Sequence, residues 1–419
     1  MNLSNKVALT LIGSLGVASA NLQAAEVTQQ QVVEQYTKVA HAVFADSYLT
    51  AQALQEKIDQ FVTSPSEATL EAAKQAWLAA RVPYQQSEVF RFGNAIVDDW
   101  EGQLNAWPLD EGLIDYVADD YQYELGNAGA KANIIANTSI NVGNTTLDTQ
   151  TISSELIASL NELGGSEANV ASGYHAIEFL LWGQDLNGTN AGAGERPYTD
   201  YVQGEGCTHG HCERRAQYLQ SVTQLLVDDL AWMEKQWATG NKENYRQLLL
   251  SESAENGLRK MLFGMGSLSL GELAGERMKV ALEAHSTEDE HDCFSDNTHN
   301  SHYYNEQGVY NVFTGSYKRV NGELVTGPSL YDLVKQQDAQ AAARIQQQFD
   351  TTRAQVHTLV ESAQNNQYFD QLIAPGNEQG NALVNQSINA LVAQTAAIED
   401  VSAIIGIDNL NPDTADHEF

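Results

Sequence analysis

Hydrophobic residues recur every three to four positions along most of the chain, which is the spacing of an amphipathic helix. The first such stretch covers 28–61, and the Ser-Pro-Ser run at 64–66 should end it, with Ser66 capping a second helix that begins at Glu67. Pro83 should bend or restart this second helix, because proline lacks the N–H that a helix interior requires. Four later segments carry the same period and are predicted to be helical: 213–237, 245–284 with an interruption at Gly264-Met265-Gly266, 331–364 and 377–405.

Strand signals are few. Residues 303–328 include alternating and aromatic positions and predict a short hairpin at most. Residues 183–206 are rich in Gly, Asn and Thr and are the best candidate for a linker. The pattern as a whole predicts an all-α protein made of two helical bundles, covering 26–190 and 191–419.

The segment 171–185 places ionisable groups inside a helix that is apolar nearly all round. His175, Glu178 and Trp182 follow one another at i, i+3 and i+7, so they lie together beside an apolar stripe. A buried imidazole and a buried carboxylate each lose hydration, which they must recover from each other, from a hydrogen-bond network or from a metal ion. A structural His–Glu pair and a metal site both satisfy this requirement.

A second mixed stripe is expected on the helix that begins at Glu67. Trp77, Arg81, Tyr84 and Glu88 fall at i, i+4, i+7 and i+11. They fit either the partly buried wall of a ligand pocket or a solvent face that carries an Arg81–Glu88 surface ion pair.

The charge of the chain narrows the possible partners. Its 22 Lys and Arg residues against 55 Asp and Glu residues give a formal net charge of -33, which disfavours nucleic acid as a partner and favours cations. Residues 1–25 have the basic start, short apolar core and small residues of a secretory signal, so the protein is expected to be exported, to the periplasm or the outer surface. No later stretch approaches the ~18 uninterrupted apolar residues of a membrane span, so no transmembrane segment is expected in the mature chain.

Three cysteines occur, and an exported protein meets an oxidising compartment. Cys207 and Cys212 flank a loop short enough to close as a disulfide, which leaves Cys293 unpaired. The alternative is a metal site in which these two cysteines act together with His209 and His211.

The loop 286–302 is rich in hard and borderline metal ligands but lacks the spacing of an EF-hand. Asp292, Asp296 and His299 are the residues of this loop that we select as candidates for a ligand pocket.

Four motifs together resemble the imelysin family of iron-regulated exported proteins, which are also catalogued as metallopeptidases. The first is Gly173-x-His175-x-x-Glu178 followed by Phe-Leu-Leu-Trp-Gly-Gln-Asp, and the others are the runs at 77–92, 105–112 and 289–299. The resemblance implies two pseudo-symmetric bundles related by duplication, with a site in the cleft between them. We expect His175 and Glu178 to coordinate a metal at this site, in a pocket that includes Trp77, Arg81, Tyr84, Glu88, Trp182, Asp292, Asp296 and His299.

Three functions are compatible with these observations. The first is iron acquisition, in which the cleft binds iron or an iron-containing ligand and the protein acts with other envelope iron-uptake components. The second is a metallopeptidase, with zinc on His175, Glu178 and a third histidine, although the chain lacks His-Glu-x-x-His. The third is a module that binds a non-metal ligand or a partner, with His175 and Glu178 as a structural pair. Whether the protein is an enzyme is therefore open at this level.

Overall fold

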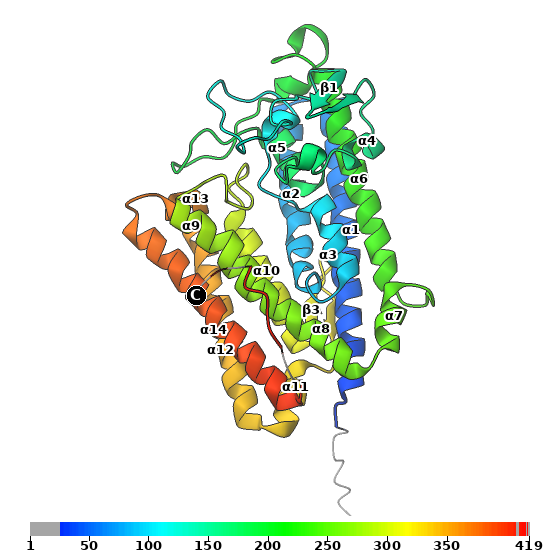
Figure 1. The fold of residues 1–419 in the computed structure, drawn as a ribbon, viewed down its shortest axis with the longest axis vertical. Coiled ribbons are helices and arrows are strands. Elements are labelled where there is room, and N and C mark those ends of the chain that lie inside the picture. The colour runs from blue at the N-terminus through cyan, green and yellow to red at the C-terminus, as the bar shows by residue number, and fades with distance from the viewer. Residues whose placement is uncertain (1–25, 408–409, 416, 418–419) are drawn as a thin grey trace, which may run out of the picture.

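The computed structural model describes residues 26–407, 410–415 and 417 (Figure 1). The expected signal segment, 1–25, lies outside the described residues. The helices in chain order are α1 (Gln29–Thr63), α2 (Glu67–Gln85), α3 (Ala95–Leu104), α4 (Ser154–Ala158), α5 (Gly173–Trp182), α6 (Cys212–Trp237), α7 (Tyr245–Ser251), α8 (Ala254–Ser267), the π-helical η6 (Leu268–Val280), α9 (Ala281–Ala284), α10 (Thr298–Thr314), α11 (Leu330–Gln337), α12 (Ala339–Gln364), α13 (Phe369–Ile373) and α14 (Glu378–Ile405). Five 3₁₀ turns are η1 (Glu88–Phe90), η2 (Glu111–Leu113), η3 (Leu163–Gly165), η4 (Tyr198–Tyr201) and η5 (Gly204–Gly206).

The all-α prediction is confirmed, since strands occur in the described residues only as two antiparallel hairpins. These pair β1 (Ser139–Val142) with β2 (Thr145–Asp148), and β3 (Ser316–Lys318) with β4 (Leu324–Thr326). The hairpin predicted within 303–328 therefore occupies only the second half of that segment. The prediction was wrong up to Thr314, because the aromatic and apolar positions there pack as faces of α10.

Helix starts follow the predicted capping chemistry. The Ser66 hydroxyl accepts a hydrogen bond from the backbone N–H of Thr69, which satisfies one of the free donors at the start of α2. Pro83 lies inside α2 and does not restart a helix, and α2 ends two residues later at Gln85.

The glycines at 264 and 266 do not interrupt their helix, contrary to expectation. The chain runs from α8 directly into η6, and a side chain at Gly264 would clash with the Val89 carbonyl oxygen. These glycines therefore allow close packing between segments rather than a break.

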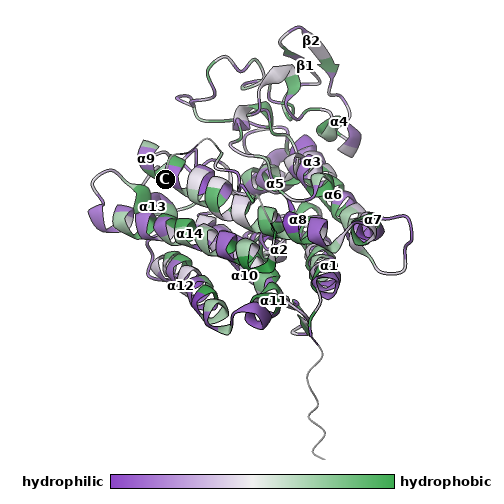
Figure 2. Cartoon of the chain, turned by 60° about the horizontal axis from the view of Figure 1, so that its bottom comes forward, coloured by the Kyte–Doolittle hydropathy of each residue, from purple (hydrophilic) through white to green (hydrophobic). Residues whose placement is uncertain are grey.

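Two groups of helices make up the body of the molecule. Helices α1, α2 and α6 pack along one another, while α12 and α14 pack together with η6 and α10 on the other side (Figure 1). Hydrophobic residues lie on the faces of the helices that pack together, and hydrophilic residues cover the outer faces (Figure 2). The division of the chain at residue 190 and the pseudo-symmetry of the halves stay predictions; α6, which begins beyond residue 190, packs on α1 and α5.

Helix α14 is long and apolar enough, by length and composition, to cross a membrane. Its buried face, which includes Val384, Leu391 and Ile398, packs in the hydrophobic cores of this structure. Core helices of proteins meet the same criteria of length and composition, and α14 packs as a core helix does.

Glu306 connects α10, α14 and η6 through a buried polar contact. Its carboxyl group is fully buried and accepts a hydrogen bond of 2.6 Å from Gln394 Nε2, which also contacts Ser269. Burial raises the pKa of Glu306 to about 8.

We expect Glu306→Gln to stabilise the protein above pH 8 and to have little effect near pH 5. The folded protein keeps the Glu306 proton up to about pH 8, whereas the unfolded chain loses it near pH 4.5, so the free energy of unfolding of the wild type falls as the pH rises through this window. Urea denaturation at pH 5 and pH 8.5 should show a difference on the order of 4 kcal/mol in the effect of the substitution, since each pH unit within the window contributes about 1.4 kcal/mol. The exposed Glu399→Gln is the control, and an effect of Glu306→Gln that is equal at both pH values would contradict this account.

Candidate metal centre

Helix α5 lies deep in the protein, and all ten of its residues are buried. Gly173 begins it at a φ of 77°, and a side chain there would clash with the Leu104 carbonyl oxygen. Glycine is therefore required for α5 to pack against the end of α3. His175 and Glu178, predicted from the sequence to be buried, are only 2% and 0% exposed.

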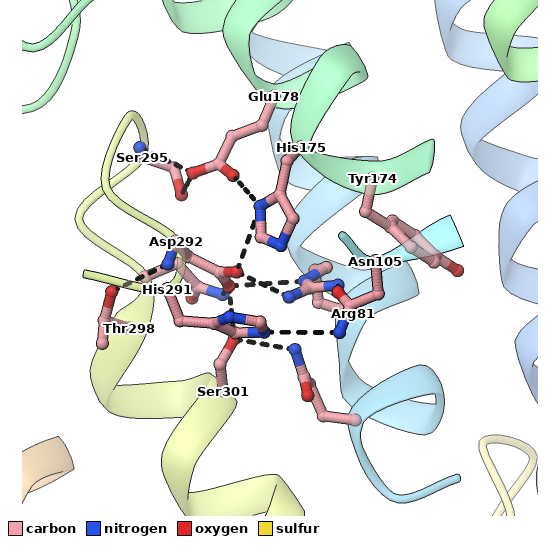
Figure 3. A network of polar contacts seen from close by, with 12 residues as sticks. Arg81, Asn105, Tyr174, His175, Glu178, His291, Asp292, Ser295, Thr298 and Ser301 are labelled. Atoms are coloured by element: carbon pink, nitrogen blue, oxygen red, sulfur yellow. Dashed lines mark hydrogen bonds and ion pairs between the residues drawn. The ribbon is translucent and has the colours of Figure 1, made fainter. Parts of the chain in front are cut away.

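His175 and Glu178 contact each other across one turn of α5 and also reach the acidic loop. His175 Nδ1 lies 3.0 Å from Glu178 Oε2. The other carboxylate oxygen, Oε1, accepts hydrogen bonds from the backbone N–H of Ser295 at 2.9 Å and from its hydroxyl at 2.6 Å (Figure 3).

Asp292 approaches this pair from the acidic loop. Arg81 donates to both of its carboxylate oxygens, at 2.6 and 3.3 Å, and Ser301 donates to Oδ2 (Figure 3). Asn297 also donates to Oδ2. Asp292 Oδ1 is 3.9 Å from His175 Nδ1. The carboxylate is thus held by a two-pronged ion pair and still faces the imidazole.

His291 completes the cluster and was not selected from the sequence. Its ring lies 4.8 Å from the ring of His175, and its Nε2 lies 3.4 Å from Asn105 Nδ2. His175, His291 and Asp292 each offer a ligand atom within 4.8 Å of the others, and they form the one such group found among the described residues. The signal that could have found His291 is its position next to Asp292, in a loop already identified as rich in ligands.

Two buried ring nitrogens in this cluster have no hydrogen-bond partner among the described residues: His175 Nε2 and His291 Nδ1. Buried polar atoms without partners are rare in folded proteins, and a metal ion is one of the groups that can satisfy them. Two imidazoles and a carboxylate are also a donor set that iron and zinc accept.

Electrostatics keep the donors in forms that suit a cation. Burial, with the Arg81 charge second, lowers the pKa of His175 to about 3, and burial lowers the pKa of His291 well below its usual value. Burial would raise the pKa of Asp292, but the Arg81 charge, the neighbouring His175 and the hydrogen bonds from Arg81 and Ser301 together outweigh burial and lower that pKa to about 2. Burial and the charge of Asp292 together raise the pKa of Glu178 well above its usual value. At neutral pH both imidazoles are neutral and Asp292 is ionised.

The stripe predicted on the second helix divides into two parts. Trp77, Tyr84 and Tyr174 surround the Arg81 guanidinium, with ring centroids 5.0 to 5.7 Å away. Glu88 does not continue the stripe, because α2 ends at Gln85. It accepts a 2.8 Å hydrogen bond from Arg277 Nη2 instead.

The alternative of a solvent face with an Arg81–Glu88 surface pair was wrong. Both residues are buried, at 1% and 2% exposure, and each pairs with a different partner. Trp182 packs edge-on against Trp77 at 5.3 Å and lines a separate cavity of about 380 Å³.

The remaining candidates lie apart from the cluster. Asp296 and His299 are buried, and neither belongs to the group of three ligands. Cys207 and Cys212 form a disulfide and Cys293 is free, so the alternative of a thiol metal site at 207–212 was wrong.

One cavity adjoins the cluster, and a larger one shares part of its wall with that inner cavity. The inner one has a volume of about 10 Å³, and His175, His291, Glu290 and Trp107 are among its lining residues. The outer one, which we call the vestibule, has a volume of about 350 Å³ and shares Trp107 and Pro108 with the inner cavity. The acidic residues that line the vestibule are Glu101, Glu162, Glu167, Glu272, Glu276 and Asp289.

The fold and the centre define an all-helical protein with a buried His–His–Asp cluster, formed between a bundle helix and an acidic loop. The chain belongs to the imelysin family, whose sequence profile matches residues 40–398. It is 24% identical over 369 residues to iron-regulated protein A of Synechococcus elongatus, with 85% of this chain and 83% of that protein covered.

Two solved structures share the fold. One is described as an iron-regulated protein A precursor from Parabacteroides distasonis, with a TM-score of 0.67, 19% identity and coverage of 91% of this chain and 97% of that one. The other is an imelysin-like protein from Psychrobacter arcticum, with a TM-score of 0.59, 14% identity and coverage of 92% and 98%.

We expect Arg81→Met to destabilise the protein strongly, because it leaves the Asp292 carboxylate buried without its counter-charge. The expected loss in free energy of unfolding is about 3–5 kcal/mol. Adding Asp292→Asn to this variant should recover much of the loss, since the amide carries no charge. Chemical denaturation provides the measurement. Arg344→Met, which removes an exposed charge from α12, should change stability by less than about 1 kcal/mol. A comparable loss of stability in Arg81→Met and Arg344→Met would contradict this explanation.

Proposed function

We propose that the protein binds an iron ion at His175, His291 and Asp292, as cargo in iron acquisition, with Glu178 as a further ligand. The observation that carries the proposal is that His175, His291 and the ionised Asp292 each offer a ligand atom within 4.8 Å of the others, while each imidazole keeps one buried nitrogen without a partner among the described residues. Two histidines and one carboxylate are the protein ligands of many non-haem Fe(II) sites. The name of the relative, iron-regulated protein A, supports iron over zinc.

Glu178 supplies a proton-dependent ligand to this site. Its raised pKa means that metal binding must displace a proton, so the affinity should increase with pH until Glu178 is ionised in the metal-free protein. The Ser295 hydrogen bonds hold one oxygen of Glu178, and the other points at His175. This arrangement orients the carboxylate before the metal arrives.

A metallopeptidase is the second candidate, because the imelysin family is also catalogued with peptidases. Zinc peptidases need an open position for water and space for a peptide beside the metal. The cavity at the centre, at about 10 Å³, has room for about one water molecule, which is far less than a peptide beside the metal requires. This size favours ion binding over proteolysis. A module for a non-metal ligand, with His175 and Glu178 as a structural pair, is the third candidate.

We place the protein outside the cytoplasm, in the periplasm or at the outer surface. The signal-like sequence of residues 1–25 supports this location, as does the description of a structural relative as a precursor. This role implies partners in the cell envelope that deliver iron to the protein or receive iron from it.

The vestibule provides the access route for the ion in this proposal. Its acidic lining attracts cations, and only Trp107 and Pro108 are common to the walls of the vestibule and the inner cavity. The Trp107 ring lies 4.5 Å from the ring of His291, so its displacement would open the inner cavity toward the vestibule.

To test the iron site, we compare ferrous binding by the wild type, His291→Ala and the partly exposed His357→Ala under anaerobic conditions. We expect one equivalent of iron in the wild type and in His357→Ala, and a loss of at least about tenfold in affinity in His291→Ala. Isothermal titration calorimetry measures the affinity, and cleavage of a protein substrate is assayed on the same samples. Equal iron content in all three proteins would eliminate the proposed centre, whereas chelator-sensitive proteolysis would favour the peptidase.

Gly102→Arg should slow iron loading while leaving the equilibrium affinity nearly unchanged. A Cβ at Gly102, which lines the vestibule, meets nothing within 4 Å, so a side chain can be introduced there without a clash at its first carbon. A positive charge there should lower the association rate by about tenfold. Stopped-flow tryptophan fluorescence gives the rate. Ala95→Arg adds the same charge to an exposed position on α3 outside the vestibule, and equal rates in the two variants would rule out this route.

A further inference from the structure

Arg196 is a buried arginine whose guanidinium is paired on one side only. Its side chain is 1% exposed, and its Nη1 donates to Asp115 Oδ2 at 2.7 Å and to Asp200 Oδ2 at 3.2 Å. Its Nε and Nη2 are also buried, and they have no hydrogen-bond partner among the described residues. Such donors are rare in folded proteins, because each has lost its hydrogen bonds to water and the guanidinium cannot give up its charge.

The two unpartnered nitrogens make up one edge of the guanidinium. Nε and Nη2 each direct an N–H from this edge in parallel, and such a pair matches the two oxygens of a carboxylate. The nearby carboxylates are engaged elsewhere. Asp115 accepts from Arg215 with both oxygens, at 2.6 and 3.0 Å, and Asp200 accepts from the Tyr116 hydroxyl at 2.6 Å. The free edge is therefore suited to an acceptor that the chain itself does not supply.

Arg196 lines a cavity of about 380 Å³, which we call the side cavity. Apolar surface in its wall comes from Tyr116, Trp182, Leu186 and Pro197. The Arg196 guanidinium lies 5.0 Å from the centroid of the Tyr116 ring. Within the part of the chain that the structure describes, the side cavity shares no lining residue with the vestibule or the inner cavity. A mostly apolar wall with one placed charge is typical of sites for small organic molecules.

A second cation lies beside the wall of the side cavity. Lys74 Nζ is 5.0 Å from the centroid of the Trp182 ring. Burial is the main cause that lowers the pKa of Lys74, and the charge of Arg196 lowers it further, whereas Glu71 and Glu195 raise it. The two cations are thus close enough to repel each other, so an anion bound at Arg196 is attracted by both.

We propose that the side cavity binds a small organic carboxylate, held by the Nε and Nη2 edge of Arg196 with its apolar body against Tyr116 and Trp182. One planar edge fits a carboxylate, whereas the tetrahedral oxygens of phosphate or sulfate call for donors from several directions. The two aromatic rings favour an apolar or aromatic body. This site is separate from the iron centre and does not rest on the proposed function.

The ligand enters past Leu186. This side chain lines the side cavity and is 73% exposed, so it lies where the cavity meets solvent. Nε and Nη2 of Arg196 are covered from water in this structure, and binding therefore includes side-chain rotation at the cavity wall, of the kind that is common when proteins bind their ligands.

The test is a titration of the mature chain with benzoate, phenylacetate and hexanoate, followed by ligand-detected nuclear magnetic resonance. Benzamide is the matched control ligand, since it has the shape of benzoate without the charge. We expect at least one of the three carboxylates to bind with one-to-one stoichiometry, and benzamide to bind at least about tenfold more weakly than benzoate. Inorganic phosphate should not compete. Absence of binding by all three carboxylates, or equal binding of benzoate and benzamide, would overturn the proposal.

Two variants assign the binding to the side cavity. Leu186→Glu places a negative charge at its opening and should weaken carboxylate binding at least about threefold, an effect that shrinks at high salt. Leu125→Glu adds the same charge at a fully exposed position outside the side cavity and should bind like the wild type. Equal binding by these two variants would contradict the proposed location.

Arg196→Lys keeps the positive charge but removes the paired N–H groups, so it should weaken carboxylate binding at least about tenfold. Thermal unfolding checks that this variant is folded, and Leu186→Glu decides the question if it is not. Unchanged carboxylate binding in folded Arg196→Lys would overturn the proposal. Ferrous binding is measured on the same variants and should equal that of the wild type, so failure of the iron proposal and failure of this one give different results.

Discussion

The buried ion pair between Arg81 and Asp292 is the interaction on which the rest of the centre depends. Both side chains are nearly inaccessible to water, so each has lost hydration that only the partner and the surrounding hydrogen bonds can replace. Asn105 accepts from the guanidinium at 2.7 Å, and Asn297 and Ser301 donate to the carboxylate. Because these residues come from separate parts of the chain, the pair holds α2, the segment after α3 and the acidic loop in one arrangement.

The same pair sets the protonation of its neighbours. The Arg81 charge, after burial, helps to keep His175 neutral, and the Asp292 charge, after burial, helps to keep a proton on Glu178. A cation that enters the cluster therefore meets neutral imidazoles, one ionised carboxylate and one carboxyl group that can release its proton. With Glu178 protonated and only Asp292 ionised, the cluster avoids the repulsion between two fixed negative charges.

A second network of hydrogen bonds and ion pairs extends from the centre toward the vestibule. Arg277, on η6, donates to Glu88, Glu272 and Asn305, and its guanidinium lies 5.3 Å from the ring of Trp107. Glu272 also contacts Arg91, and both line the vestibule. The π-helical geometry of η6 is uncommon in proteins and frequently occurs at functional sites. In this protein the π-helical segment η6 places Arg277 against Trp107, whose side chain is part of the wall shared by the vestibule and the inner cavity.

The sequence by itself determined the features that depend on spacing within one helix. The periodicity predicted α1, α2, α6 and the all-α class, Ser66 marked the start of α2, and the i, i+3 spacing of His175 and Glu178 placed them in contact on a buried helix. These are local relationships, and the geometry of the α-helix is enough to produce them.

Only the tertiary structure decided which distant residues meet that helix. Arg81 and Asp292 are separated by 211 positions, and Glu178 and Ser295 by 117, so no helical period relates them. In the acidic loop, composition offered many ligands, but irregular backbone has no period from which side-chain direction can be read. The fold turned His291 and Asp292 toward α5, and it left Asp296 and His299 outside the group of three. Glu88 was assigned to the wrong stripe for a related reason: its helical spacing from Arg81 applies only while the helix continues, and α2 ends at Gln85.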